Sequence, residues 1–158
     1  YGAGLRLGEV IHLRVSDIDG ERLTIRIEQG KGGKDRYTLL SARLLEILRV
    51  YWRLSHPTGW LFPGKGDEHP MDPSTVQRLY GAAKVRAGIT KPGGIHGLRH
   101  AFATHLLESG VDIHTIQRLL GHGHISTTMR YFHLAQPILT AHRSPLDLLD
   151  ALPELPPT

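Results

Sequence analysis

The sequence predicts one α+β domain that is mainly helical and has a small antiparallel β-hairpin near its N-terminus. The chain has 158 residues, of which 40% are hydrophobic and 22% charged. These are ordinary values for a globular domain that can bury a core. Residues 22–28 alternate between polar and apolar side chains. Much of the remaining chain has apolar residues at helical spacing between capping residues and glycines.

The N-terminal part is expected to form a short helix and then the hairpin. Apolar residues at roughly helical spacing predict a helix that ends near Leu13. The stretch "RLTIRIEQ" reads as a half-buried strand, and "YTLL" (37–40) as its returning partner. The apolar side of the first strand would consist of Leu23, Ile25 and Ile27. The glycine-bearing turn "GKGGKDR" between the strands places two lysines at the hairpin tip.

Capping and breaking residues divide the rest of the chain into five predicted helices. They run from Ser41 to about Leu54, from Asp72 to about Ala87, from about His96 to Glu108, from Asp112 to Leu120, and from Ser126 onward. The first of them has an apolar face made by Leu44, Leu45, Leu48 and Tyr51. Residues 55–71 are rich in Gly and Pro and read as a loop, in which "WLFP" is an apolar anchor.

Composition limits the function classes. There is no cysteine, so a disulfide framework and a thiolate metal site are excluded. No apolar run approaches the length of a membrane span, and we expect no membrane partner. The formal charge of +4 permits a nucleic-acid partner without requiring one. The hairpin tip is not a P-loop, because a strand follows it and neither lysine precedes a Ser or Thr.

The stretch "GGIHGLRHAFATH" holds a histidine pair and an arginine on one helical face. His96 and His100 have zinc-ligand spacing, but the Glu of an HExxH site is missing and Arg99 would repel a metal. We therefore predict no metal and no cofactor. His96 and Arg99 are three apart, and such a pair suits phosphate chemistry, since Arg matches phosphate oxygens and His exchanges protons near neutral pH.

Ordinary structural readings compete with these functional ones. The turn in "LLGHGHISTT" would also fit a helix-turn-helix, with a recognition helix opening at Ser126. Arg6, three residues before Glu9, would ordinarily be a surface ion pair. Tyr131 would ordinarily be a packing residue. What favours the functional reading is the order and spacing of six residues: Arg6, Lys31, His96, Arg99, His122 and Tyr131.

In that order the six residues resemble the catalytic domain of the tyrosine recombinases, the phage-integrase and Xer-type family. "GAGLRLGEVIHLRVSDID" resembles the first arginine box, and "GKGGKDRYTLL" the catalytic-lysine hairpin. "HGLRHAFATHLLESGVDIHTIQRLLGH" resembles the His-x-x-Arg box and the histidine after it, and "STTMRYFH" the nucleophile segment. The resemblance runs from residue 1 to about residue 135. Tyr131 lies nine residues after His122, as in the family pattern.

The resemblance implies a role for each matching residue. Arg6 and Arg99 would clamp the scissile DNA phosphate, and Glu9 would orient the site. Lys31 would protonate the leaving 5′ oxygen, and Lys34 ranks lower as a second lysine on the same turn. All four cations would contact DNA: Arg6, Lys31, Lys34 and Arg99.

Three further roles concern the nucleophile. His96 would help to handle the tyrosine proton, His122 would hydrogen-bond the phosphate and buttress the site, and Tyr131 would be the nucleophile. His124 and His133 are expected to have no part in the chemistry. The sequence has no acidic cluster for Mg²⁺, which separates this reading from acidic-triad nucleases and transposases.

The resemblance also implies domain organisation and partners. Residues 1–143 would form a catalytic domain that is truncated at its N-terminus, and 144–158 a tail that docks on a neighbouring protomer or packs on its own domain. The partners would be double-stranded DNA and further copies of the chain, as a tetramer on DNA, and the location cytoplasmic. Gly8 departs from the family's usual Ser or Thr. The alternative is a non-catalytic DNA-binding module or a decayed recombinase remnant.

Overall fold

The computed structural model describes residues 1–28 and 35–132. In chain order the elements are α1 (Leu7–Ile11), the 3-10 helix η1 (Val15–Asp17), β1 (Ile18–Asp19), β2 (Thr24–Ile27), β3 (Arg36–Leu39), α2 (Ala42–Ser55), α3 (Pro73–Arg86), α4 (His96–Glu108), α5 (Ile113–Leu120) and α6 (Ile125–Phe132). The α+β class and the five predicted helices after the hairpin are confirmed. The predicted lysines at the hairpin tip, Lys31 and Lys34, and the tail 144–158 lie outside the described residues.

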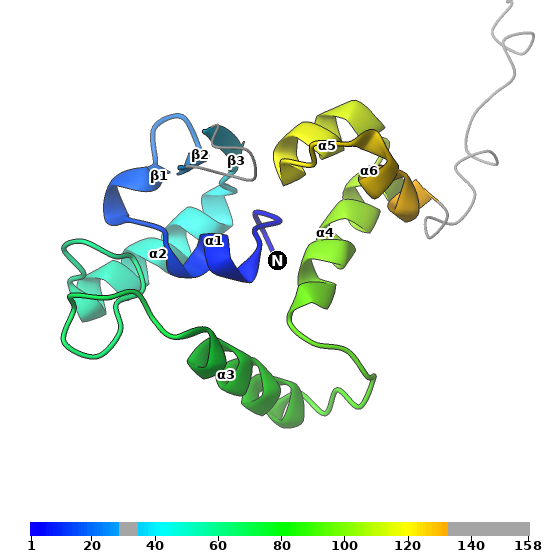
Figure 1. The fold of residues 1–158 in the computed structure, drawn as a ribbon. Coiled ribbons are helices and arrows are strands. Elements are labelled where there is room, and N and C mark those ends of the chain that lie inside the picture. The colour runs from blue at the N-terminus through cyan, green and yellow to red at the C-terminus, as the bar shows by residue number, and fades with distance from the viewer. Residues whose placement is uncertain (29–34, 133–158) are drawn as a thin grey trace, which may run out of the picture.

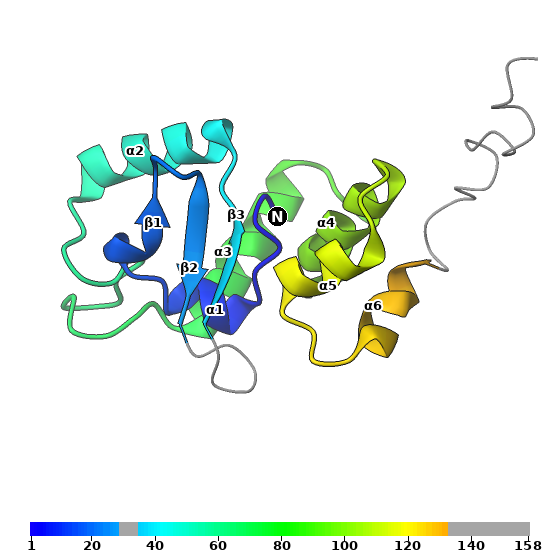
Figure 2. The same ribbon diagram turned by 90° about the horizontal axis from the view of Figure 1, so that it is seen from above.

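The elements form two halves with the N-terminal residues between them. Figure 1 shows the sheet and α2 on one side and α4, α5 and α6 on the other, and Figure 2 shows the same division from above. Helix α3 leads from the first half toward the second. Within the described part of the chain, no helix is both long enough and apolar enough to cross a membrane.

The sheet has three antiparallel strands in the order β1-β2-β3. Ile25 pairs with Thr38 and Ile27 with Arg36, so the predicted hairpin is present. The short strand β1 was not predicted, because two residues are too few to show alternation. The placement of Leu23 on the buried side is wrong. Leu23 lies before β2 with φ of 53° and is 41% exposed.

The first core lies between the sheet and α2. Its buried members are Ala3, Leu13, Ile25, Leu40, Leu45 and Leu61. The predicted apolar face of α2 packs here, since Leu44, Leu48 and Tyr51 cover the cluster. The apolar anchor in the long loop is also confirmed, because Leu61 is buried in this core. Burying one such side chain contributes about 1.5–3 kcal/mol.

The second core joins α4, α5 and α6. Its buried members are Phe102, Ala103, Leu107, Ile116, Leu120 and Tyr131. Helix α5 is strongly amphipathic. Its first turn is capped by Asp112, whose carboxylate accepts hydrogen bonds from the His114 and Thr115 amides, both at 3.0 Å. Tyr131 is only 4% exposed. The Tyr131 ring is thus a packing group, as the ordinary reading expected. A packed ring is compatible with a separate chemical role for the hydroxyl.

The N-terminal residues connect the two cores. On the sheet side, the Thr38 hydroxyl donates to the Ala3 carbonyl at 2.9 Å. On the helical side, Arg99 Nη1 donates to the Gly4 carbonyl at 2.7 Å. Gly4 has φ of +63°, and a Cβ placed on it would lie 2.4 Å from Phe102 Cδ1. Only glycine therefore allows this close approach of the N-terminal segment to α4.

We predict that Gly4→Ala destabilises the protein by about 3 kcal/mol, because it combines left-handed backbone strain with a steric clash in the second core. Gly88→Ala is the matched control. Gly88 has φ of +64°, and a Cβ added to it would meet nothing within 4 Å, so only strain of about 1 kcal/mol is expected. Urea unfolding followed by circular dichroism measures both. Equal losses in the two variants would contradict the close approach.

Candidate active site

A cleft of about 210 Å³ gathers most of the predicted site residues. It is lined by five of the six residues that the sequence pattern singles out: Arg6, His96, Arg99, His122 and Tyr131. These residues come from the start of α1, from α4, from the turn after α5 and from α6. The two that lie farthest apart in the sequence, Arg6 and Tyr131, are separated by 125 positions. The sixth, Lys31, lies outside the described residues.

Arg99 is held rigidly inside the protein. It is 3% exposed, and its two terminal nitrogens donate to the Gly4 carbonyl at 2.7 Å and the Leu120 carbonyl at 2.5 Å. Burial, with the neighbouring positive charge of Arg6, lowers the pKa of Arg99 to about 10. The guanidinium therefore keeps its charge at neutral pH.

Arg6 stands at the N-cap of α1, directly before the helix begins. Its Nη1 donates to Glu9 Oε1 at 2.7 Å, and its backbone amide donates to Glu9 Oε2 at 2.7 Å. Its Nη2 donates to the Gly121 carbonyl at 3.3 Å. The expected ion pair with Glu9 is present, but it is partly buried and does not lie on the surface as the ordinary reading predicted. Arg6 also lines the cleft.

The Glu9 carboxylate is the counter-charge for three arginines. It pairs with Arg6 at 2.7 Å, with Arg36 at 2.9 Å and with Arg99 at 3.6 Å. Burial by itself would raise the pKa of Glu9, but hydrogen bonds and charge from Arg36 and Arg6 outweigh burial and hold the pKa below its usual value. Glu9 is thus ionised at neutral pH and fixes three guanidiniums.

Arg36 is a member of this group that sequence reasoning missed. It lies at the start of β3, and its Nε donates to the Leu119 carbonyl at 3.2 Å while its Nη2 donates to Glu9. Arg36 and Thr38 alternate with the exposed Tyr37, so a charged residue faces inward from this strand. The inward-facing position of Arg36 in the strand was the signal from which its membership of the group could have been inferred. It was overlooked because Arg36 was assigned to the turn.

The Tyr131 ring is packed between histidines. It lies parallel to the His122 ring, with 10° between planes and 6.1 Å between centroids, and 5.4 Å from the His100 ring. Burial raises the pKa of Tyr131, while the positive charges of Arg99 and Arg6 act in the opposite direction. Tyr131 is therefore a neutral phenol at physiological pH, and a base must take its proton before it can act as a nucleophile.

His122 is oriented from both its ring and its backbone. Its Nδ1 lies 2.9 Å from the hydroxyl of the buried Thr128. Its carbonyl accepts from Gln117 Nε2, and its amide donates to the Gln117 carbonyl, both at 3.1 Å. The turn itself depends on Gly121, which closes α5 with φ of +63°. Helix α6 then begins at Ile125, one residue before the expected Ser126.

His100 is the second residue that the sequence reasoning missed. Its ring lies 4.7 Å from that of His96 and 5.4 Å from that of Tyr131, so it neighbours both. Burial and the nearby charge of His96 lower the pKa of His100, which leaves it neutral and able to accept a proton. The spacing that first suggested a zinc pair thus brings two histidines toward a phenol. His124, for which no role was expected, also lines the cleft.

Among the described residues, no three His, Cys, Asp or Glu side chains gather as metal ligands would. The polar groups that line the cleft are three guanidiniums, four imidazoles, one phenol and the Thr127 hydroxyl. Glu9 pairs with two of the guanidiniums, Arg6 and Arg99, and Arg130 adds a third positive charge, so the cleft carries an excess of positive charge. Each guanidinium has five N–H donors, so the bonds to protein leave donors on Arg6 and Arg99 for an anion. The arrangement is suited to a phosphate group beside a nucleophile.

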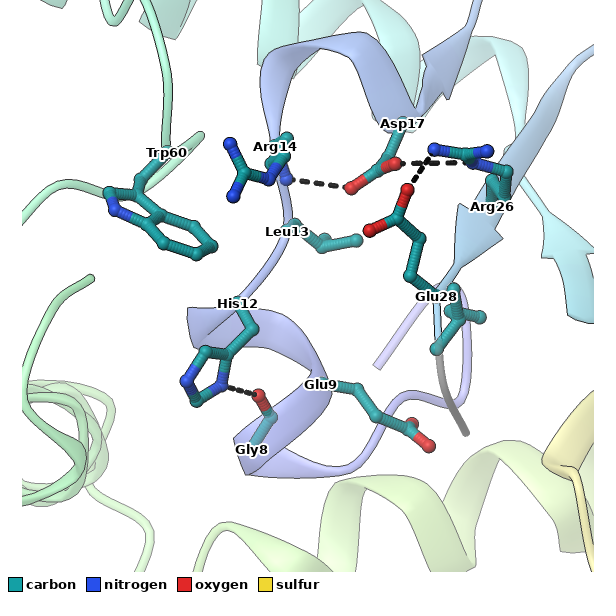
Figure 3. Close-up of a pocket in the computed structure, with 10 residues that line it drawn as sticks. Gly8, Glu9, His12, Leu13, Arg14, Asp17, Arg26, Glu28 and Trp60 are labelled. Carbon is teal, nitrogen blue, oxygen red and sulfur yellow. Dashed lines mark hydrogen bonds and ion pairs between the residues drawn. The ribbon is translucent and has the colours of Figure 1, made fainter. Parts of the chain in front are cut away.

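A larger cavity, of about 440 Å³, lies on the hairpin side of α1. Figure 3 shows Arg26 directed at Asp17 and Glu28 there, with Arg14 near Trp60. The Arg14 guanidinium lies 4.4 Å from the Trp60 ring centroid. None of the five pattern residues that the structure describes lines this cavity, and its Arg26–Asp17 ion pair connects β2 with η1. We assign the cavity a structural role in joining these two elements.

The fold and the cleft together match a known class of proteins. The sequence pattern of the phage integrase family matches residues 1–137. The chain belongs to this family. The match covers every described element and all six residues of the pattern.

Individual relatives agree with this assignment. A protein of Sinorhizobium fredii named as an integrase/recombinase is 48% identical over 157 residues, which are 99% of this chain and 51% of that protein. The tyrosine recombinase XerA of Thermococcus onnurineus is 40% identical over 157 residues, which are 98% of this chain and 55% of that protein. The chain thus spans about half the length of these curated relatives.

Solved structures show the same fold. The crystal structure of XerA recombinase superposes with a TM-score of 0.74 at 34% identity, covering 88% of this chain and 50% of that one. The XerH site-specific recombinase, described in a post-cleavage complex with a palindromic difH substrate, gives a TM-score of 0.76 at 27% identity. It covers 85% of this chain and 40% of XerH.

We predict that Glu9→Gln lowers the free energy of unfolding by about 3 kcal/mol at pH 7, because it leaves one buried and two partly buried guanidiniums without their counter-charge. The folded-state pKa of Glu9 lies below its ordinary value of 4.5. Its contribution is therefore present above about pH 4.5 and is lost as pH falls through the lower folded value. Urea unfolding across this pH range should show the two proteins converging toward acid.

Glu28→Gln serves as the matched control for Glu9→Gln. Glu28 also pairs with an arginine, Arg26, but its side chain is 49% exposed. Its loss should change stability by no more than about 0.5 kcal/mol. If both variants lose the same stability, Glu9 is an ordinary surface carboxylate and the charge-compensation account is wrong.

Proposed function

We propose that this chain is the catalytic part of a site-specific DNA recombinase that breaks and rejoins DNA through a covalent 3′-phosphotyrosine, without a metal ion. The observation that carries the proposal is the position of Tyr131 in one cleft with Arg6 and Arg99. A phosphodiester is anionic and resists attack by oxygen. Two preorganised guanidiniums can neutralise its non-bridging oxygens as charge develops.

Tyr131 is the nucleophile of the proposed reaction. A bond forms between its hydroxyl oxygen and phosphorus, and the bond from phosphorus to the 5′ oxygen breaks. A phenol is a better leaving group than an alkyl alcohol, so the adduct can be reversed by a 5′ hydroxyl and the strand resealed. The adduct preserves the energy of the phosphodiester for that second step.

Protons must move at both ends of the reacting phosphate. The phenol proton passes to a histidine. The family pattern gives this role to His96, and the His100 ring, which lies next to both the His96 and Tyr131 rings, relays the proton. His122 buttresses the phosphate side of the cleft, and Glu9 orients the arginines. Lys31 protonates the departing 5′ oxygen, with Lys34 as the lower-ranked alternative. The two lysines are assigned from the family pattern alone.

Double-stranded DNA is the proposed partner. The XerH structures are described as complexes with a difH substrate before and after cleavage, which supports the same partner for this chain. We further propose that residues 1–143 act as the catalytic domain, that 144–158 serve as a docking tail, and that copies of the chain assemble as a tetramer on DNA. The excess positive charge around the cleft supports the contact with DNA.

Covalent trapping tests the function without knowledge of the target site. The chain is incubated with a pool of duplexes that carry randomised sequence around a nick, so that the short cleaved fragment leaves and the adduct cannot be resealed. We expect the unmodified chain to form an adduct that survives denaturing electrophoresis. Tyr131→Phe should form none, because it keeps the packed ring but lacks the attacking oxygen.

Tyr80→Phe is the matched control, since Tyr80 lies on α3 and does not line the cleft. It should trap DNA as well as the unmodified chain. Sequencing of the captured strands identifies the site and the scissile phosphate. Binding of DNA without any adduct would favour a non-catalytic DNA-binding module. Trapping by Tyr131→Phe would show that another residue is the nucleophile.

A further inference from the structure

The residue that joins the hairpin half to the helical half at the cleft is Arg36. Its side chain is 11% exposed, and it links β3 to α1 through Glu9 at 2.9 Å and to α5 through the Leu119 carbonyl at 3.2 Å. It is not among the residues that line the cleft. Arg36 therefore touches the groups that hold the site and does not face the space where a phosphate would lie.

The partners of Arg36 also hold the two clamp arginines. Glu9 binds Arg6 and Arg99, and three successive carbonyls at the end of α5 each accept a bond from a different guanidinium. These pairs are Leu119 with Arg36, Leu120 with Arg99, and Gly121 with Arg6. Carbonyls at a helix C-terminus have no partner within the helix and carry partial negative charge, so they suit cations. A shift of Arg36 would move both of the elements that set Arg6 and Arg99.

The Arg36 side chain packs directly against Gly121. Gly121 has φ of +63°, and a Cβ placed on it would lie 2.6 Å from Arg36 Nε. Gly121 therefore serves two purposes, since it ends α5 in the left-handed conformation and leaves room for the guanidinium. The next residue in the chain is His122. The Arg36 contact consequently also fixes the start of the turn that carries this imidazole.

Packing alone does not account for an arginine at this position. Burying a guanidinium is costly, and Arg36 Nη1 is buried with no hydrogen-bond partner among the described residues. An apolar side chain of similar volume would fill the same space without that cost. What only an arginine provides is a planar fork that donates to a carboxylate and to a carbonyl at the same time.

We propose that Arg36 is a positioning residue for the reaction: by joining Glu9 to the end of α5 it sets the relative placement of Arg6, Arg99 and His122. The proposal rests on the proposed function for its catalytic meaning. It makes the first residue of β3 part of the active-site framework, although this strand contributes no group to the cleft. Geometry rather than charge is the essential property of Arg36.

Arg36→Lys separates geometry from charge. Lysine keeps the positive charge but cannot donate to Glu9 and the Leu119 carbonyl in the arginine geometry. With DNA captured from the randomised pool, we expect single-turnover adduct formation to slow by about 10- to 100-fold, as small misplacements of catalytic groups do. Affinity for the uncleaved duplex should change by less than about twofold, because Arg36 does not face the cleft.

A substrate with an uncharged scissile group distinguishes a positioning role from a merely structural one, because only a positioning role makes the rate loss depend on the charge of that group. A methylphosphonate at the scissile position removes the charge that the arginine pair neutralises. The rate difference between Arg36→Lys and the unmodified chain should therefore narrow on this substrate. Arg26→Lys, a change to an ion-paired arginine on the neighbouring strand, should leave the rate within about twofold on both substrates.

Gly121→Ala disturbs the position of Arg36 from the α5 side of the contact. Its added Cβ would displace Arg36 and should slow adduct formation as Arg36→Lys does. Gly110→Ala is the control for backbone strain, since Gly110 has φ of +86° with nothing within 4 Å of the added carbon. It should keep the rate within about twofold. Rates within twofold of the unmodified chain for both Arg36→Lys and Gly121→Ala would overturn the proposal.

Failure of the proposed function gives a different result. If the unmodified chain forms no Tyr131-dependent adduct, the recombinase proposal fails. Arginine side-chain NMR then decides the role of Arg36 without DNA. Shifts of the Arg6 and Arg99 Nε–H signals in Arg36→Lys, with no such shifts in Arg26→Lys, support the positioning role. Unchanged Arg6 and Arg99 signals in Arg36→Lys overturn it.

Discussion

The compensation of three guanidiniums by the Glu9 carboxylate is the interaction on which the cleft depends. Arg6, Arg36 and Arg99 repel one another, and the lowered pKa of Arg99 reflects burial together with the charges of the other two. Glu9 and the carbonyls at the end of α5 share the task of holding them. Because these partners belong to α1 and α5, the charge arrangement also fixes how the sheet half meets the helical half.

The fold was largely predictable because its signals are local. Asp72 and Asp112 cap the helices that they were expected to open, and the apolar face of α2 packs as its spacing indicated. The errors fall where local signals fail. Strand β1 is too short to show a period, and the alternation that seemed to include Leu23 is broken by a turn with positive φ before β2.

The site was predictable only as a pattern of types and spacings. Five of its six residues meet in one cleft, although no short segment contains more than a few of them. The sequence did not indicate that Arg36 and His100 belong to the site, because the contacts that place them there form only in the folded chain. The partners of Arg36 lie 27 and 83 positions away, and His100 was considered only as a metal ligand. No spacing rule within one helix or strand reports such contacts.

The three arginines bind backbone carbonyls at the end of α5, and this choice of partner has a consequence for variation in the chain. A carbonyl is the same in every residue type, so the outward side chains of α5 can change without altering what Arg6, Arg36 and Arg99 bind. A change in helix length has the opposite effect. One inserted residue would turn the last carbonyls by about 100° and move them by about 1.5 Å. Natural or designed diversity in α5 should therefore appear as substitution at constant length.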